Sequence, residues 1–431
     1  MTPSARIAAA VALLEAIETA PARPADAVAN AFFRERRYIG GSDRRAVGER
    51  AWAILRNRRH LEWWLARHGG APAPRLLAAA SLLLAGMSMP SLEREFSGLR
   101  FAPAPLDAGE KAVLRGLEGH TLAHPAMPDA VRLEVPDWLL PVLRDSLGPR
   151  LEAELEAMAA EAPLDLRANL LKTDREQARQ ALAAQGIATE PTPLSRWGLR
   201  ARGRQPVTAT AAFREGLVEI QDEGSQLVAA LLGAAPGMRV ADWCAGAGGK
   251  TLALAMTMQN RGHIVACDVS APRLEGAVRR LRRAGVHNAE RHLIVPGDKW
   301  SKRHRAGFER VLVDAPCTGT GTWRRNPDAR LRLTEQDLAE LTAKQAAILA
   351  QAATLVAPGG WLVYATCSLL APENAAQVEA FLTAHADFAL LPLARAWPWE
   401  GPLPGMGPYL ELSPARHDTD GFFAAALERR A

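Results

Sequence analysis

Cysteine and long apolar runs are scarce in this chain of 431 residues. Its four cysteines do not make a disulfide framework, and they fit a reducing compartment, where a cysteine is either buried or reactive. No apolar run approaches the roughly 20 residues that a membrane-spanning helix needs. The N-terminal "IAAAVALLEAI" is broken by Glu15 and followed by Glu18, which favours an amphipathic helix over a signal peptide. We therefore expect a cytoplasmic protein with no membrane partner.

The charge is mildly basic, with a net charge of +5 and a pI of about 9.3. Arginine and lysine cluster in three stretches, 273–285, 299–310 and 322–332. The first fits a solvated helix face as well as a binding surface. The third directly follows a cysteine-containing turn, where guanidinium groups suit a phosphodiester substrate. The charge distribution therefore points to nucleic acid.

Three regions differ in their apolar periodicity. Residues 1–140 repeat apolar positions at helical spacing and predict an all-α bundle. Residues 141–215 begin with a helical connector and continue as a small α+β module. Residues 216–431 alternate strand-like and helix-like segments, which predicts an α/β domain with a doubly wound, Rossmann-like parallel sheet. The last apolar segment, "DGFFAAALE", adds a strand at the edge of that sheet.

A glycine-rich turn, "VADWCAGAGGKT" (240–251), follows the first strand of this domain. It fails the phosphate-loop pattern because Cys244 occupies the first glycine position, and it fails the dinucleotide pattern because Thr251 occupies the third. S-adenosylmethionine binding needs a tight turn with acidic residues after the second and third strands. Asp268 and Asp298 hold those places, where open α/β sheets bind ligands. The alternative for each aspartate is a turn or helix cap.

Two of the four cysteines follow apolar strands, in "DAPCTG" (314–319) and "YATCS" (364–368). The sheet order brings Asp314, Cys317 and Cys367 to one edge. A thiol there acts as a nucleophile if a nearby cation lowers its pKa, and Lys250 is a candidate cation. The alternative is that such cysteines only fill space, as we expect of Cys267 within its apolar strand.

Carbon 5 of a pyrimidine is a methyl acceptor that requires a thiol, because it is a weak nucleophile by itself. A thiolate that adds to C6 makes an enamine, and C5 then accepts the methyl group. Asp314 suits the N3/N4 edge of the base and stabilises the protonated adduct. The base must be accessible, either in single-stranded RNA or by flipping.

The motifs "DWCAGAGGKT", "DAPCTGTGTWRRNPD" and "YATCSLLAPEN" resemble those of the Nol/Nop/Sun family of RNA (cytosine-C5) methyltransferases. The resemblance covers roughly residues 163–431, and it includes "VEIQDEGSQLVA" and "HDTDGFFAAALE". The N-terminal helices, through "SDRRAVGERAWAILRNRRHLEWWL", are similar to the NusB-like RNA-binding domain of bacterial small-subunit ribosomal RNA methyltransferases. The implied partner is ribosomal RNA.

The resemblance implies distinct roles for the two cysteines. In DNA cytosine methyltransferases the Pro-Cys cysteine attacks the base, whereas in this RNA family the Thr-Cys cysteine does so. Cys367 is thus the implied nucleophile and Cys317 assists product release, with Asp314 and Lys250 beside them. The implied S-adenosylmethionine contacts are Cys244, Ala245, Gly246, Ala247, Gly248, Gly249, Lys250, Asp268, Arg273, Asp298 and Asp314, and no metal is expected.

Several features and alternatives stay open. The family turn reads Ala-Ala-Pro-Gly-Gly-Lys, so Ala247 replaces a proline here and the turn should be more flexible. The segment 397–414 is rich in Pro and Gly and is expected to be a surface loop near the active site. A tRNA cytosine-C5 methyltransferase and a non-catalytic RNA-binding or assembly protein are the competing functions, and a monomer is the expected state. A DNA methyltransferase is disfavoured because it leaves Thr366-Cys367 without a role.

Overall fold

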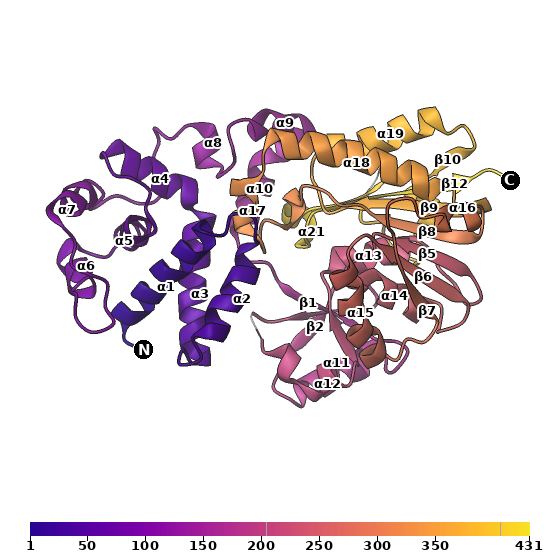
Figure 1. Ribbon diagram of the computed structural model, residues 1–431, viewed down its shortest axis with the longest axis horizontal. Helices are drawn as coiled ribbons and strands as arrows, with labels where there is room; N and C mark the ends of the chain where they lie inside the picture. The colour runs from indigo at the N-terminus through magenta and orange to yellow at the C-terminus, as the bar shows by residue number, and fades with distance from the viewer. Residues whose placement is uncertain (204, 406) are drawn as a thin grey trace. The chain divides into compact units, whose positions relative to one another are not determined.

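The computed structural model describes residues 1–203, 205–405 and 407–431. The chain forms two compact units (Figure 1). We call the first the helical unit, which comprises Met1–Arg144, Leu151–Ala159 and Trp323–Leu333. The second is the sheet unit, which comprises Asp145–Arg150, Ala160–Thr322 and Thr334–Ala431. The chain therefore passes more than once from one unit to the other.

The helical unit confirms the helical prediction for the first 140 residues. In α3, Val47, Ala51 and Ile54 recur at helical spacing and are fully buried, which gives the helix one apolar face. Its helices are α1 (Pro3–Glu18), α2 (Ala25–Glu35), α3 (Gly41–Arg56), α4 (Arg58–Arg67), α5 (Pro74–Leu84), α6 (Met89–Glu95), α7 (Ala108–Arg115), α8 (Asp129–Arg132), α10 (Leu151–Ala159) and α17 (Pro327–Arg332), and α9 (Leu139–Leu147) with η1 (Gly148–Arg150) leads from α8 to α10.

The α17 segment belongs to the helical unit although it follows the cysteine turn by only a few residues. Arg330 is 2% exposed and donates to the backbone carbonyl of Arg56, and Arg324 is 3% exposed. Asp328 accepts a hydrogen bond from the backbone N–H of Ala25 at 3.1 Å. The expectation that the 322–332 arginines face a phosphodiester is therefore wrong for Arg324 and Arg330, because both are buried within the protein.

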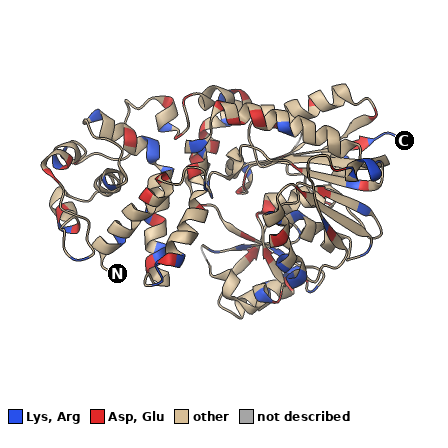
Figure 2. Ribbon diagram, viewed as in Figure 1, with Lys and Arg blue, Asp and Glu red and all other residues tan. Residues whose placement is uncertain are grey.

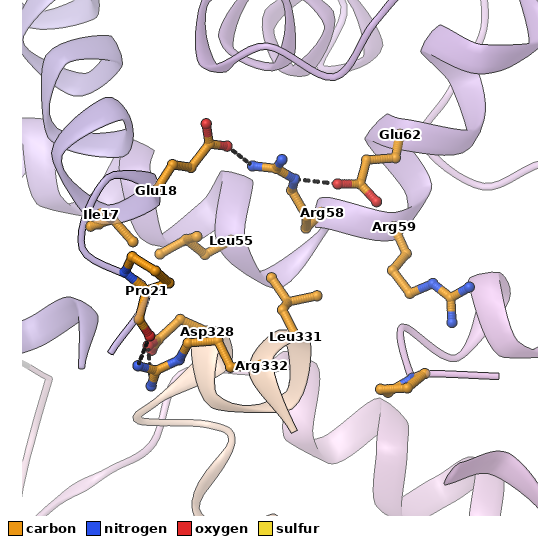
Figure 3. Close-up of a pocket in the computed structure, with 11 residues that line it drawn as sticks. Ile17, Glu18, Pro21, Leu55, Arg58, Arg59, Glu62, Asp328, Leu331 and Arg332 are labelled. Atoms are coloured by element: carbon orange, nitrogen blue, oxygen red, sulfur yellow. Dashed lines mark hydrogen bonds and ion pairs between the residues drawn. The ribbon is translucent and has the colours of Figure 1, made fainter. Parts of the chain in front are cut away.

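Figure 3 shows α17 beside the other helices of the helical unit. Residues of both line a cavity of about 380 Å³, and its apolar wall includes Ile17, Leu55 and Leu331. The charged groups around it pair with one another: Arg58 bonds to Glu18 at 2.6 Å.

The small α+β module is an antiparallel sheet with strand order β2-β3-β1-β4. It extends to β4, beyond residue 215, where we expected the module to end. Leu166, Leu199 and Val218 form its core with one helix face. Its elements are β1 (Leu164–Ala168), α11 (Arg175–Ala183), β2 (Thr189–Pro191), β3 (Gly198–Ala201), η2 (Val207–Ala209), α12 (Ala211–Arg214) and β4 (Val218–Ile220).

The main sheet has the order β10-β12-β9-β8-β5-β6-β7, and β11 also pairs with β12. Strands β5 to β9 are parallel and β12 runs antiparallel to β9. Its strands are β5 (Arg239–Trp243), β6 (His263–Asp268), β7 (Ala289–Leu293), β8 (Phe308–Asp314), β9 (Val356–Thr366), β10 (Phe388–Leu391), β11 (Leu410–Leu412) and β12 (Phe422–Arg429). The edge prediction for "DGFFAAALE" is wrong: β12 lies inside the sheet, where it pairs with β10 on one side and β9 on the other.

Helices cover both faces of this sheet, so the doubly wound prediction is confirmed (Figure 1). Val311 and Val313 pack with α18 and α19 on one face, whereas Leu312 packs with α13 and α14 on the other. The helices are α13 (Glu223–Leu231), α14 (Gly249–Thr257), α15 (Ala271–Ala284), α16 (Trp300–Arg303), η3 (Thr320–Thr322), α18 (Glu335–Ala353), η4 (Ala371–Glu373), α19 (Ala375–Ala384), α20 (Leu393–Ala396) and α21 (Pro414–His417). In the described part of the chain, no helix has the length and apolarity to cross a bilayer.

The structure also describes the surroundings of the 273–285 basic cluster and of the 397–414 segment. Figure 2 shows acidic and basic residues interspersed along the sheet unit, and within the 273–285 cluster Arg283 pairs with Glu219. Part of that cluster is therefore structural. The 397–414 segment, apart from Met406, which lies outside the described residues, is more than a surface loop. Trp399 stacks edge-on against Trp197 with ring centroids 5.1 Å apart and anchors the segment.

Candidate active site

The site forms where the strand order of the main sheet reverses. The chain proceeds from β5 to β6 and β7 on one side and from β8 to β9 on the other, so β5 and β8 are neighbours at the switch. Ligands bind at the carboxyl ends of the strands at such a point. The loops after β5, β6, β8 and β9 all lie at this edge, and they carry the residues singled out in the sequence.

The glycine turn after β5 has the tight backbone that a cofactor loop needs. Cys244, Gly246 and Gly248 all have positive φ angles, of 69°, 56° and 78°. Gly248 caps α14 with no side-chain hydrogen bond, so the helix N-terminus keeps amide groups for a ligand. A Cβ at Gly246 would meet open space, which leaves room beside the turn for a ligand.

Two arginine side chains restrain the turn at Ala247, where the resembled family has a proline. Arg280 on α15 donates to the carbonyl of Ala247 at 2.8 Å, and Arg167 donates to that of Gly249 at 3.1 Å. These two hydrogen bonds restrain the turn from two sides. They oppose the extra flexibility that we expected from the missing proline, and the sequence did not reveal them.

Asp268 ends β6 and braces the same turn. Its carboxylate accepts from the backbone N–H groups of Gly246 and Ser270, each at 2.8 Å. Asp242, in β5, accepts from the Thr251 hydroxyl at 2.6 Å. Full burial raises the pKa of Asp242 to about 7, with the nearby carboxylates adding to the shift.

Asp298 lies in the loop after β7, five residues past the strand's last residue (298 − 293). It is bonded to His292 at 2.5 Å and to the backbone N–H of Trp300 at 2.7 Å. The Trp300 N–H is the main cause that lowers the pKa of this carboxyl. The loop lines a cavity of about 510 Å³ with Trp243 and Val269. Its aromatic and aliphatic walls suit a flat heterocycle.

Of the remaining expected cofactor residues, Arg273 is exposed to solvent and Asp314 is held in an ion pair. Arg273 is exposed in the first turn of α15. Asp314, at the end of β8, binds Lys250 of α14 with an Nζ–Oδ2 distance of 2.6 Å. Burial lowers the pKa of Lys250, but the Asp314 carboxylate outweighs it and the net shift is upward. Lys250 therefore forms an ion pair with Asp314.

Cys317 and Cys367 lie together, with their Sγ atoms 3.4 Å apart. The hydrogen bond with Cys367, and then burial, raise the pKa of Cys317 well above its ordinary value. Cys317 therefore stays a thiol. Cys267 is fully buried in β6, as expected of a space-filling residue.

Sequence reasoning missed the groups that hold these cysteines. Glu373 and Gln345 are both fully buried and bond to the loop of Cys317. Glu373 stands in "PEN", six residues past Cys367 (373 − 367), and its nearness to the cysteine motif was a usable signal. Gln345 lies in the middle of a long helix, and nothing in its local pattern marks it.

This fold, with its glycine turn, acidic strand ends and switch-point loops, defines an S-adenosylmethionine-dependent methyltransferase. The family model described as 16S rRNA methyltransferase RsmB/F matches residues 229–428, and an RsmF/B-like ferredoxin-like domain matches residues 135–208. The chain belongs to the RsmB/F methyltransferase family, and its cofactor is S-adenosylmethionine.

Individual relatives agree with this assignment. Ribosomal RNA small subunit methyltransferase B of Xanthomonas campestris is 34% identical over 89% of this chain and 89% of its own length. The probable enzyme of that name from Synechocystis is 36% identical over 68% of this chain, and the match spans 66% of the relative. The crystal structure of PH0851 aligns over 100% of this chain and 99% of that one, with a TM-score of 0.81 and 26% identity. A methyltransferase homologue from Pyrococcus horikoshii covers 71% of this chain and 100% of its own, with a TM-score of 0.61 and 30% identity.

Proposed function

We propose that this protein methylates carbon 5 of a cytosine in small-subunit ribosomal RNA through a covalent bond between Cys367 and C6. The observation that carries the proposal is the 3.4 Å separation of the Cys317 and Cys367 sulfur atoms. Two cysteines at one strand edge suit a reaction that forms and then breaks a thioether. The relatives named small-subunit ribosomal RNA methyltransferase B support the choice of RNA.

The residues present fit the cofactor. Gly246 leaves open space beside the turn, and the N-terminus of α14 has no side-chain cap at Gly248. Asp268 ends β6, Arg273 lies in the first turn of α15, and Asp298 lines the 510 Å³ cavity after β7, so these residues would meet the ribose and adenine. When bound, S-adenosylmethionine supplies an electrophilic methyl group.

The chemistry then follows from the side chains. The Cys367 thiolate bonds to C6, and the C5=C6 electron pair makes C5 nucleophilic enough to take the methyl group. Loss of the C5 proton to a base re-forms C5=C6, and the C6–S electron pair returns to Cys367. Cys317, held as a thiol, lies in hydrogen-bond range of the departing sulfur and assists the release.

In the proposed reaction, Asp314 binds the cytosine base and Lys250 positions Asp314. A carboxylate accepts from the exocyclic amino group of cytosine and from a protonated N3, and that contact strengthens as the ring gains a proton. Lys250 holds the Asp314 carboxylate in place at 2.6 Å.

The cysteine roles are tested by two substitutions. Cys367→Ala should abolish both methyl transfer and any covalent RNA adduct. Cys317→Ala should slow release, so an RNA-linked protein band should accumulate on a denaturing gel. Cys267→Ala, in the buried strand, serves as the control and should behave as the parent protein. Turnover in Cys367→Ala, or no band in Cys317→Ala, contradicts the assignment.

The substrate is tested separately. Bisulfite sequencing of total RNA from a strain that lacks the protein should show one lost 5-methylcytosine in small-subunit ribosomal RNA. Loss of the mark from a transfer RNA instead would replace the proposed substrate and leave the chemistry intact.

A further inference from the structure

Glu373 is a buried carboxylate beside the Cys317 loop. It ends η4 and is 0% exposed. Its carboxylate accepts from the backbone N–H of Thr318 at 2.8 Å, from the Thr318 hydroxyl, and from the side-chain amide of Gln345 at 2.9 Å. All three donors are neutral. A buried carboxylate among neutral donors keeps a large desolvation cost, so fold stability alone does not account for it.

Glu373 and Gln345 together hold both neighbours of Cys317. The Gln345 amide also donates to the carbonyl of Pro316 at 3.0 Å. One hydrogen-bonded pair thus fixes the residue before Cys317 and the residue after it. The Cys317 side chain is left with little freedom except to face Cys367.

A second set of bonds joins the same two loops. The Ser368 hydroxyl lies 3.3 Å from the Thr318 hydroxyl and 3.1 Å from the Thr320 hydroxyl. The backbone N–H of Gly321 donates to the carbonyl of Cys367 at 2.9 Å. These bonds attach the loop after β8 to the loop after β9, and Glu373 supplies the charged member of the network.

We propose that Glu373 is a positioning residue that sets the Cys317 thiol against Cys367, an inference that rests on the cysteine roles proposed above. The tyrosine hydroxyl of Tyr364 donates to the Glu373 carbonyl at 2.7 Å and fixes the backbone on which the carboxylate stands. The Glu373 charge also contributes, after Cys367 and burial, to raising the pKa of Cys317. The contacts to Pro316 and Thr318 carry the positioning role, and this electrostatic contribution acts in the same direction.

The test compares Glu373→Gln with Glu379→Gln. Glu379 is an exposed glutamate of α19, so the control makes the same chemical change away from the site. Glu373→Gln should lower kcat about tenfold or more, because a charge-assisted bond to Thr318 is lost. The KM for RNA and the affinity for S-adenosylmethionine should stay within about twofold, since the Glu373 carboxylate is fully buried against Thr318 and Gln345. An RNA-linked band should accumulate, as in Cys317→Ala.

A structural role alone would not give that band, and a double substitution separates the two. If Glu373 acts through Cys317, adding Glu373→Gln to Cys317→Ala should change adduct formation little beyond the single substitution. Fully additive effects would overturn the inference. Thr318→Val, which keeps the shape and removes one donor, should move the adduct level in the same direction and provides a second variant if Glu373→Gln folds poorly.

The outcomes distinguish this inference from the proposed function. If Cys317→Ala accumulates the adduct while Glu373→Gln and Thr318→Val release product at the parent rate, the positioning role is wrong and the cysteine roles stand. If Cys317→Ala itself shows no adduct, the release role fails and the inference built on it fails too.

Discussion

At the scale of single residues, the titration of Asp242 makes a prediction about stability. Its pKa is raised to about 7 in the folded protein because the carboxyl is buried, against about 3.9 for an unfolded aspartate. Between these values the folded state holds a proton that the unfolded state has lost. The free energy of unfolding should therefore fall as pH rises from about 4 to 7, by up to about 1.4 kcal/mol per pH unit.

The Asp242→Asn variant should lack this slope, since its amide does not ionise and its oxygen still accepts from Thr251. Thermal unfolding from pH 5 to 8 should show the parent protein losing Tm relative to the variant. Glu340→Gln, at an exposed position of α18, is the control and should follow the parent curve. Parallel curves for the parent and Asp242→Asn would show that Asp242 titrates at its ordinary pKa.

Single residues also show what sequence reasoning can reach. Cys317, Cys367, Lys250 and Asp314 were found because chemistry limits which side chains stand at strand ends, and the structure brings them to one edge. The brace of Ala247 by Arg280 was not found. It depends on a side chain 33 residues away (280 − 247) whose reach only the packed structure fixes.

At the scale of secondary-structure elements, α2 depends on a cap supplied from far along the chain. Pro24, at its N-cap, has no side-chain hydrogen bond, and Asp328 of α17 accepts from the Ala25 N–H instead. Asp328→Ala should lower the free energy of unfolding of the helical unit by about 1–2 kcal/mol. Chemical denaturation followed by helix circular dichroism measures the loss.

Asp328→Asn is the matched variant, because an amide oxygen still accepts from Ala25 while the charge beside Arg332 is removed. It should retain most of the stability, since the Arg332 side chain is 33% exposed and its ion pair is screened by water. Equal losses in the Ala and Asn variants would mean that the charge, and not the cap, stabilises α2.

Elements differ in how well their patterns predict them. Helix α15 was predictable from Leu274, Ala277 and Leu281 at helical spacing and from Gly285 at its end. The place of β12 was not, because a buried apolar run fits the interior and the edge of a sheet alike until pairing partners are known. The assignment of α17 to the helical unit was also hidden, since its arginines were interpreted as a binding surface, whereas Arg330 is buried within the helical unit.

At the scale of the whole molecule, the unit boundary runs through the sequence at several points. The Trp323–Leu333 segment leaves the sheet unit shortly after Cys317 and packs with helices of the first 144 residues. The helical unit is therefore not a simple N-terminal appendage. Sequence reasoning divided the chain linearly, because periodicity shows where elements begin and end but not which elements pack together.

A truncation exploits this arrangement. Deletion of Met1–Arg144 removes the partners of Asp328, Arg330 and Arg332, and it should leave a sheet unit that aggregates on heating at a lower temperature than the full chain. The same deletion with Trp323–Leu333 replaced by a glycine-serine stretch of equal length should recover solubility, because the unpartnered segment is gone.

Both proteins should bind S-adenosylmethionine with the affinity of the full chain by calorimetry, since the glycine turn, Asp268 and Asp298 all lie within the sheet unit. If the simple deletion is as soluble as the replaced form, the segment does not depend on the helical unit; if either protein loses cofactor binding, the sheet unit does not hold the cofactor site alone.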